Sequence, residues 1–100
     1  AENPKTIADS ISVSIPSNAY LAKRAVEKSK GFSITVSDEE ILKAQKILAS
    51  KTGVFAEPSS SATVAALLKL KNSALLDKKE QIVLLITGNG LKNIESVKIF

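Results

Sequence analysis

Apolar residues alternate with polar ones in two separate stretches of the chain. Within residues 7–15, Ile11, Val13 and Ile15 alternate with serines ahead of a proline, and residues 32–36 alternate in the same way. Such alternation predicts strands with one apolar face. Residues 81–87 instead form an unbroken apolar run rich in β-branched side chains, which predicts a strand buried on both faces.

Helical spacing fills the segments between these predicted strands. Residues 19–30 place small and apolar side chains on one face and charges on the other, ahead of a glycine stop at residue 31. Residues 38–52 repeat the pattern, with Ser37 and Glu40 spaced as a capping box. A third helix is predicted over residues 62–70, because the preceding serines offer oxygens to its first amide hydrogens.

The order of these elements predicts an α/β fold. We expect a three-layer-type fragment with a small, mainly parallel sheet flanked by helices, joined by right-handed crossovers. Residues 97–100 could add a short edge strand. The 100 residues suffice for one small domain with a modest core.

Composition excludes several kinds of chemistry. The sequence contains no cysteine and no histidine, so we expect no metal site built on thiolate or imidazole and no serine–histidine–aspartate triad. Its 14 basic and 10 acidic residues are scattered, which argues against a nucleic-acid-binding stripe. The longest apolar run falls short of the about 20 residues of a membrane helix, so we expect a soluble protein without a membrane partner. The absence of cysteine is compatible with a reducing interior, and we expect a cytoplasmic location.

Polar and glycine residues end the last predicted strand abruptly, at Thr87, Gly88, Asn89 and Gly90. In an open α/β sheet, the carboxyl end of a strand is a common place for ligand contact. A tight turn also needs glycine, so this stretch alone fits either a structural turn or a ligand site. The amino end of the third helix would suit an anion.

Four segments, in order, resemble the carboxy-terminal part of the threonine synthases, which are pyridoxal-phosphate enzymes of fold type II. They are TIADSI, VSDEEILKAQ, TGVFAEPSSSATVAALLKL and LLITGNGLKN. The resemblance implies that residues 1–100 are a single segment from the carboxy-terminal part of the large domain of a pyridoxal 5'-phosphate-dependent lyase. It also implies O-phospho-L-homoserine as the small-molecule substrate, conversion of that substrate and water to L-threonine and phosphate, the rest of the enzyme as a partner and a homodimer.

The same resemblance assigns roles to particular residues. Thr87 matches the threonine that hydrogen-bonds the pyridine nitrogen of the cofactor, and Gly88 lies beside it in the cofactor-binding turn. Glu57 matches an acid near the cofactor and is carried over only as a wall of the site. The family's Schiff-base lysine has no counterpart in this chain, so no catalytic residue is assigned and the chain alone is expected to be inactive.

Departures from the family pattern leave the substrate open. Asn93 stands where many members have aspartate, and Ser12, Ser14 and Ile15 replace arginine, glycine and asparagine. A related threonine or serine dehydratase would share much of the pattern. A non-catalytic, stand-alone α/β module is a further alternative.

Overall fold

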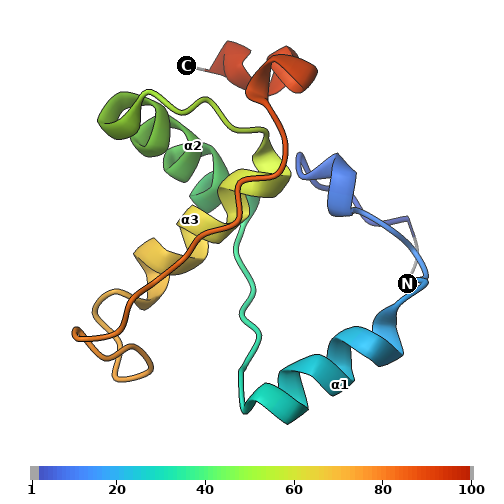
Figure 1. Ribbon diagram of the computed structural model, residues 1–100. Helices are drawn as coiled ribbons and strands as arrows, with labels where there is room; N and C mark the ends of the chain where they lie inside the picture. Colours follow the sequence, from blue (N-terminus) through green and yellow to red (C-terminus); the bar gives the residue numbers. More distant parts are fainter. Residues whose placement is uncertain (1–2, 100) are drawn as a thin grey trace.

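The computed structural model describes residues 3–99 as helices joined by extended chain (Figure 1). In chain order, the elements are the 3-10 helix η1 (Asp9–Ile11), the α-helices α1 (Ala19–Ser29), α2 (Asp38–Thr52) and α3 (Pro58–Leu70), and the 3-10 stretch η2 (Gly90–Ile99). The stretch η2 is interrupted by a kink at Asn93, where the backbone leaves helical geometry.

Helices α2 and α3 pack against each other and form the core of the described chain (Figure 1). The core residues are Ala8, Ile41, Ala44, Val64 and Ala65. Three of these five are alanines, whose small side chains let the two helices and the first segment approach closely. This core is small. It holds the ends of the helices in place but does not fill the interior of a whole domain.

The predicted boundaries of α2 are confirmed. The Ser37 backbone N–H donates to Glu40 Oε2 (2.7 Å), and the Glu40 N–H donates to Ser37 Oγ (3.1 Å), which completes the capping box. At the other end, Gly53 adopts a left-handed φ of 74° and its N–H donates to the Ala49 carbonyl. Glycine takes this conformation without the steric cost that other residues meet.

The predicted parallel sheet is wrong. Within residues 3–99, the only β pairing is one isolated antiparallel bridge between Ala56 and Asn89. The predicted strands at residues 32–36 and 81–87 run extended, yet neither pairs with another strand (Figure 1). Strand patterning describes side-chain faces, but a strand also needs a neighbour to complete its hydrogen-bond ladder, and the described chain brings none to these segments.

Two further predicted strands also differ from the structure. The chain within residues 7–15 turns into η1 instead of a strand, which lets Ala8 enter the core. Residues 97–99 belong to η2, and Phe100 lies outside the described residues.

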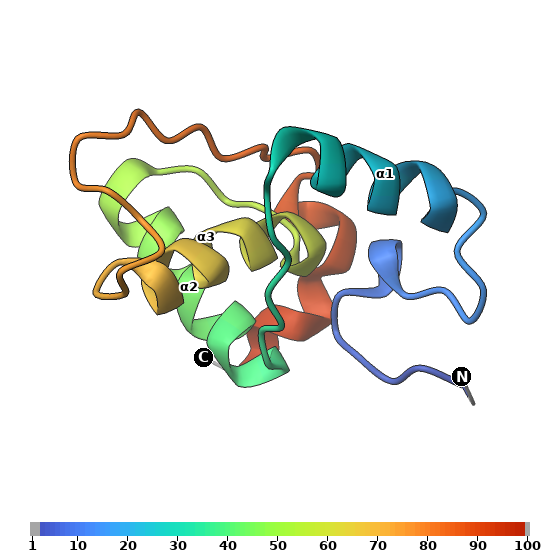
Figure 2. The ribbon, with the colours of Figure 1, turned by 90° about the horizontal axis from the view of Figure 1, so that it is seen from below.

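Helix α1 forms where the sequence predicts it but lies apart from α2 and α3 (Figures 1 and 2). It has no buried residue. Its face of small and apolar side chains therefore buries no residue within the described part of the chain. The helix ends through Lys30 in the left-handed conformation (φ 54°), one residue before the predicted glycine stop.

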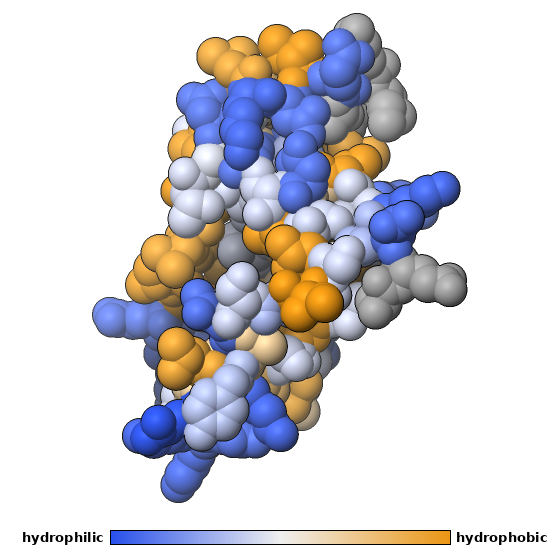
Figure 3. All heavy atoms as spheres, turned by 90° about the vertical axis from the view of Figure 1, so that its right-hand side faces the viewer, coloured by the Kyte–Doolittle hydropathy of each residue, from blue (hydrophilic) through white to orange (hydrophobic). Residues whose placement is uncertain are grey.

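Large apolar side chains remain exposed over much of the surface. The most exposed are Ile15 and Val83, at 85% each. Figure 3 shows several apolar patches separated by hydrophilic residues on one face of the molecule. None of the helices in residues 3–99 combines the length and apolar character that crossing a membrane requires.

Candidate functional site around Thr87 and Glu57

The amino end of α3 contacts both η1 and η2, so three distant parts of the chain meet there (Figure 1). Two backbone hydrogen bonds join the segment before α3 to the glycine turn. The Glu57 N–H donates to the Gly88 carbonyl (3.0 Å), and the Gly90 N–H donates to the Phe55 carbonyl (2.9 Å). A β-carbon at Gly90 would overlap the ring of Phe55. The close approach of the two segments therefore requires glycine at residue 90.

Ser60 holds the turn from the side of α3. Its hydroxyl accepts hydrogen bonds from the N–H groups of Thr87 (3.1 Å) and Gly88 (2.8 Å), and it shares a third with Thr87 Oγ1 (3.1 Å). Ser60 is only 2% exposed. These contacts connect Thr87 and Gly88 directly to the first turn of α3.

The serines do not cap α3 as the sequence predicted. The N-cap residue is Glu57 in an extended conformation, without a side-chain cap, and Pro58 occupies the first turn. Proline suits that position because its missing N–H would have no partner within the helix. The helix therefore begins four residues before the predicted Ala62, and Ser60 is left to bond the turn.

The side chain of Glu57 forms the centre of a polar network. Glu57 is 4% exposed, and its Oε2 accepts a hydrogen bond from Ser10 Oγ (2.7 Å). Lys92 Nζ lies 3.4 Å from the same oxygen and donates to Ser10 Oγ at 2.7 Å. The carboxylate also packs against Gly88. Glu57 therefore contacts the turn, and its role as a wall of a cofactor site stays a prediction.

Two side chains, Gln45 and Asp38, fix the elements that carry these groups. Gln45, which is 1% exposed, donates from Nε2 to the Ala56 carbonyl at 2.7 Å and so ties α2 to the segment before Glu57. At the start of α2, Asp38 accepts hydrogen bonds from the Thr6 hydroxyl and the Ile7 N–H. Asp38 thus anchors the segment that leads to Ser10, which gives this first-turn acid a structural role.

Sequence reasoning identified Thr87, Gly88 and Glu57, and the structure brings them together. The sequence patterns did not point to Gln45, Ser60 or Lys92 as members of this site. Lys92 lies in the segment LLITGNGLKN and could have been selected as the partner of a buried acid. Gln45 follows Ile41 at helical spacing and could have been recognised as a polar group on a buried face.

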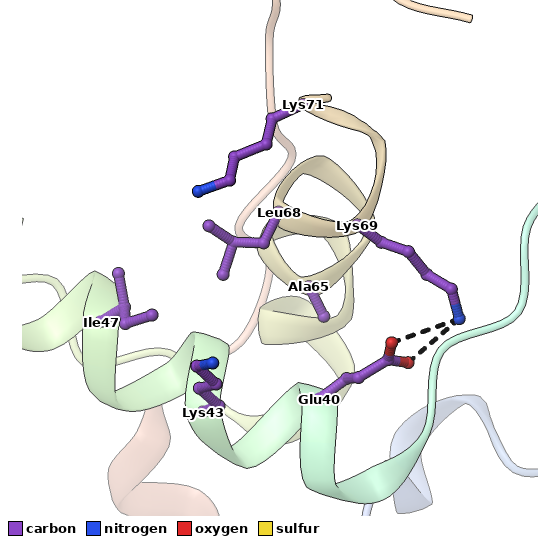
Figure 4. Close-up of a pocket in the computed structure, with 7 residues that line it drawn as sticks. All are labelled: Glu40, Lys43, Ile47, Ala65, Leu68, Lys69 and Lys71. Atoms are coloured by element: carbon purple, nitrogen blue, oxygen red, sulfur yellow. Dashed lines mark hydrogen bonds and ion pairs between the residues drawn. The ribbon is translucent and has the colours of Figure 1, made fainter. Parts of the chain in front are cut away.

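A separate pocket of about 260 Å³ lies between α2 and α3 (Figure 4). It is lined by Glu40, Lys43, Ile47, Ala65, Leu68, Lys69 and Lys71. Lys69 spans its edge, pairing with Glu40 (3.2 Å) and donating to the Thr35 carbonyl (2.8 Å). This pocket includes none of the residues around Thr87. Among residues 3–99, no group of acidic side chains is placed to hold a metal ion.

The matches of this chain to known proteins agree with one another. The family described as "Pyridoxal-phosphate dependent enzyme" matches residues 1–88. The threonine synthase of Methanocaldococcus jannaschii is 46% identical over 92 residues, covering 92% of this chain and 23% of the relative. The threonine synthase of a Bacillus species is also 46% identical, covering 92% of this chain and 26% of the relative. That of Mycobacterium tuberculosis is 41% identical, covering 91% and 25%. The chain thus spans about a quarter of the length of these relatives.

Proposed function

Because this chain belongs to the pyridoxal-phosphate-dependent enzyme family, we propose that it is the carboxy-terminal part of the large domain of a threonine synthase. The complete enzyme would convert O-phospho-L-homoserine and water to L-threonine and phosphate. The observation that carries this proposal is the meeting of three of the four motif segments, through Ser10, Glu57 and the Thr87–Gly88 turn, at the amino end of α3.

The residues at this turn fit the cofactor. Thr87 is exposed and offers a neutral hydroxyl, which suits an unprotonated ring nitrogen because it donates a hydrogen bond without adding charge. The Gly88 N–H donates to Ser60 Oγ and the Gly88 carbonyl accepts from the Glu57 N–H, so the position of the turn that carries the Thr87 hydroxyl is set by two buried residues. Bound pyridoxal phosphate supplies the electron-withdrawing ring that the reaction needs.

In this proposal the residues of the chain bind the cofactor and orient it. Thr87 would hold the ring nitrogen, Gly88 would keep the turn close to Glu57, and Glu57 would form a wall of the site. The lysine that bonds the cofactor covalently would come from elsewhere in the enzyme. A homodimer and a cytoplasmic location are further predictions of the same assignment.

The experiment is a product assay on the full-length natural protein loaded with pyridoxal phosphate. With O-phospho-L-homoserine as substrate, we expect L-threonine and phosphate to form in equal amounts. The departures at Ser12, Ser14, Ile15 and Asn93 favour testing a dehydratase in parallel. Formation of a 2-oxo acid and ammonia from threonine or serine, without phosphate release from O-phospho-L-homoserine, would contradict the proposal. No turnover of any of these substrates would favour a non-catalytic module.

A further inference from the structure

The hydroxyl of Ser60 has one proton and two lone pairs, and three neighbouring groups use them. The N–H groups of Thr87 and Gly88 both point at Ser60 Oγ, at 3.1 Å and 2.8 Å. Backbone N–H groups can only donate. These two bonds therefore occupy both lone pairs of the Ser60 oxygen.

The third contact of Ser60 is then directional. Ser60 Oγ and Thr87 Oγ1 lie 3.1 Å apart, and geometry alone allows either oxygen to be the donor. With both lone pairs of Ser60 already used, its remaining capacity is its own proton. Ser60 therefore donates to Thr87 Oγ1, and the proton of Thr87 must point elsewhere.

Burial protects the hydrogen bonds of Ser60 from competition with water. Ser60 is 2% exposed, so water cannot readily replace the acceptor that it offers to the two N–H groups. The neighbouring serines behave differently, because Ser61 Oγ faces the Ala56 carbonyl at 3.5 Å and Ser59 Oγ has no hydrogen-bond partner among the described residues. Of the three serines, Ser60 is the one that bonds the turn.

We propose that Ser60 is a positioning residue, which orients the Thr87 hydroxyl as a hydrogen-bond donor toward the pyridine nitrogen of the cofactor. The inference rests on the proposed function, since it assumes that Thr87 faces that nitrogen. It goes further by naming the residue that sets the direction of that bond: Ser60, through its own bond to Thr87 Oγ1, keeps Thr87 the donor and the ring nitrogen the acceptor. An unguided threonine hydroxyl could rotate and present a lone pair instead.

The test uses the full-length protein loaded with pyridoxal phosphate that carries ¹⁵N in its ring. The ¹⁵N chemical shift reports whether the ring nitrogen accepts a hydrogen bond, independently of turnover. Thr87→Val is the reference for loss of the donor. Ser60→Ala removes the positioning hydroxyl, and Ser60→Cys fills a similar volume with a much weaker donor and acceptor, which keeps the test decisive if Ser60→Ala does not fold. Ser59→Ala is the matched control.

We expect Ser60→Ala and Ser60→Cys to move the ring ¹⁵N shift in the same direction as Thr87→Val, by at least half as much, while Ser59→Ala leaves it unchanged. Exchange of the Thr87 and Gly88 amide hydrogens should also accelerate about tenfold, because each loses its acceptor. Faster amide exchange with an unchanged ¹⁵N shift in both Ser60 variants would overturn the inference and leave Ser60 a purely structural residue.

The proposed function fails in a different way. If wild-type protein does not bind the labelled cofactor, or if Thr87→Val leaves the ¹⁵N shift unchanged, the assignment of Thr87 to the cofactor is wrong. The role of Ser60 is then overturned with it. If Thr87→Val moves the shift and the Ser60 variants do not, only the role of Ser60 is overturned.

Discussion

The carboxylate of Glu57 occupies the space that a side chain on Gly88 would need. A β-carbon built at Gly88 overlaps the end of the Glu57 side chain. Glutamate side chains are flexible, but this one is buried and held by Ser10 and Lys92. Glycine at residue 88 and glutamate at residue 57 therefore depend on each other.

Replacing Gly88 by alanine should force the Glu57 carboxylate out of its network. Overpacking at a buried site costs about 1 to 3 kcal/mol, which lowers the Tm of a large protein by about 2 to 4 °C per kcal/mol. We expect Gly88→Ala to lower the Tm of the full-length protein and to weaken cofactor retention.

The double variant Gly88→Ala with Glu57→Ala gives the control for this contact. The clash needs both side chains. Glu57→Ala should therefore lower the Tm by less in the Gly88→Ala background than in wild type. Strictly additive changes in Tm would show that the two residues do not interact as described.

Lys92 should contribute less to the stability of the fold than its contact with a buried acid suggests. Its side chain is 59% exposed, whereas that of Glu57 is 6% exposed. Ion pairs with an exposed member are weakened by solvent and salt, so Lys92→Met should cost less than about 1 kcal/mol. We expect the Tm difference between Lys92→Met and wild type to shrink at high salt. A difference that does not depend on salt would indicate that the lysine acts through packing of its methylene groups.

The charge on the Glu40 carboxyl should make the stability of the fold depend on pH. The backbone N–H of Ser37, and then the Lys69 ammonium, lower the pKa of the Glu40 carboxyl from its ordinary value of 4.5. A pKa that is lower in the folded state stabilises the fold above the unfolded value and loses that contribution as the pH falls through the folded value. We expect the Tm advantage of wild type over Glu40→Gln to be present at neutral pH and to shrink as the pH falls below 4.5. An advantage that stays constant into this acidic range would contradict the role of the charge.

The isolated chain should self-associate. Side chains such as Ile15, Val83 and Leu85 are largely exposed in the described structure, and association would remove them from water. We expect sedimentation equilibrium on the 100-residue chain to give a mass above 10.6 kDa, with a dimer as the predicted species. A clean monomer that unfolds cooperatively would show that the chain is stable without a partner.

Local features of the fold were readable from the sequence, whereas long-range pairing was not. The capping box of Ser37 and Glu40 and the stop at Gly53 depend on residues within a few positions, so their spacing predicted α2 correctly. The sheet was predicted from side-chain alternation, which shows that a segment can be extended but does not show that another segment lies beside it. Residues 81–87 illustrate the difference, because they are extended and unpaired.

The candidate site was predictable in part. Its members Thr87 and Glu57 lie in motifs that resemble a known family, and the structure brings these motifs together through Gly88. The role of Ser60 was not predictable, because three consecutive serines look alike in sequence. Only the path of the chain decides that one of them reaches a turn 27 residues away.

If the Thr87 hydroxyl holds the cofactor, Thr87→Val is the substitution that shows it most directly. Valine keeps the shape of threonine but removes the hydroxyl, so an unmet hydrogen bond should cost about 1 to 3 kcal/mol. In the full-length enzyme we predict a loss of about 10-fold to 100-fold in kcat/KM for O-phospho-L-homoserine, faster loss of cofactor on dialysis, and recovery of both in Thr87→Ser. Wild-type turnover and wild-type cofactor retention in Thr87→Val would show that this hydroxyl does not hold the cofactor and would leave the turn with a structural role only.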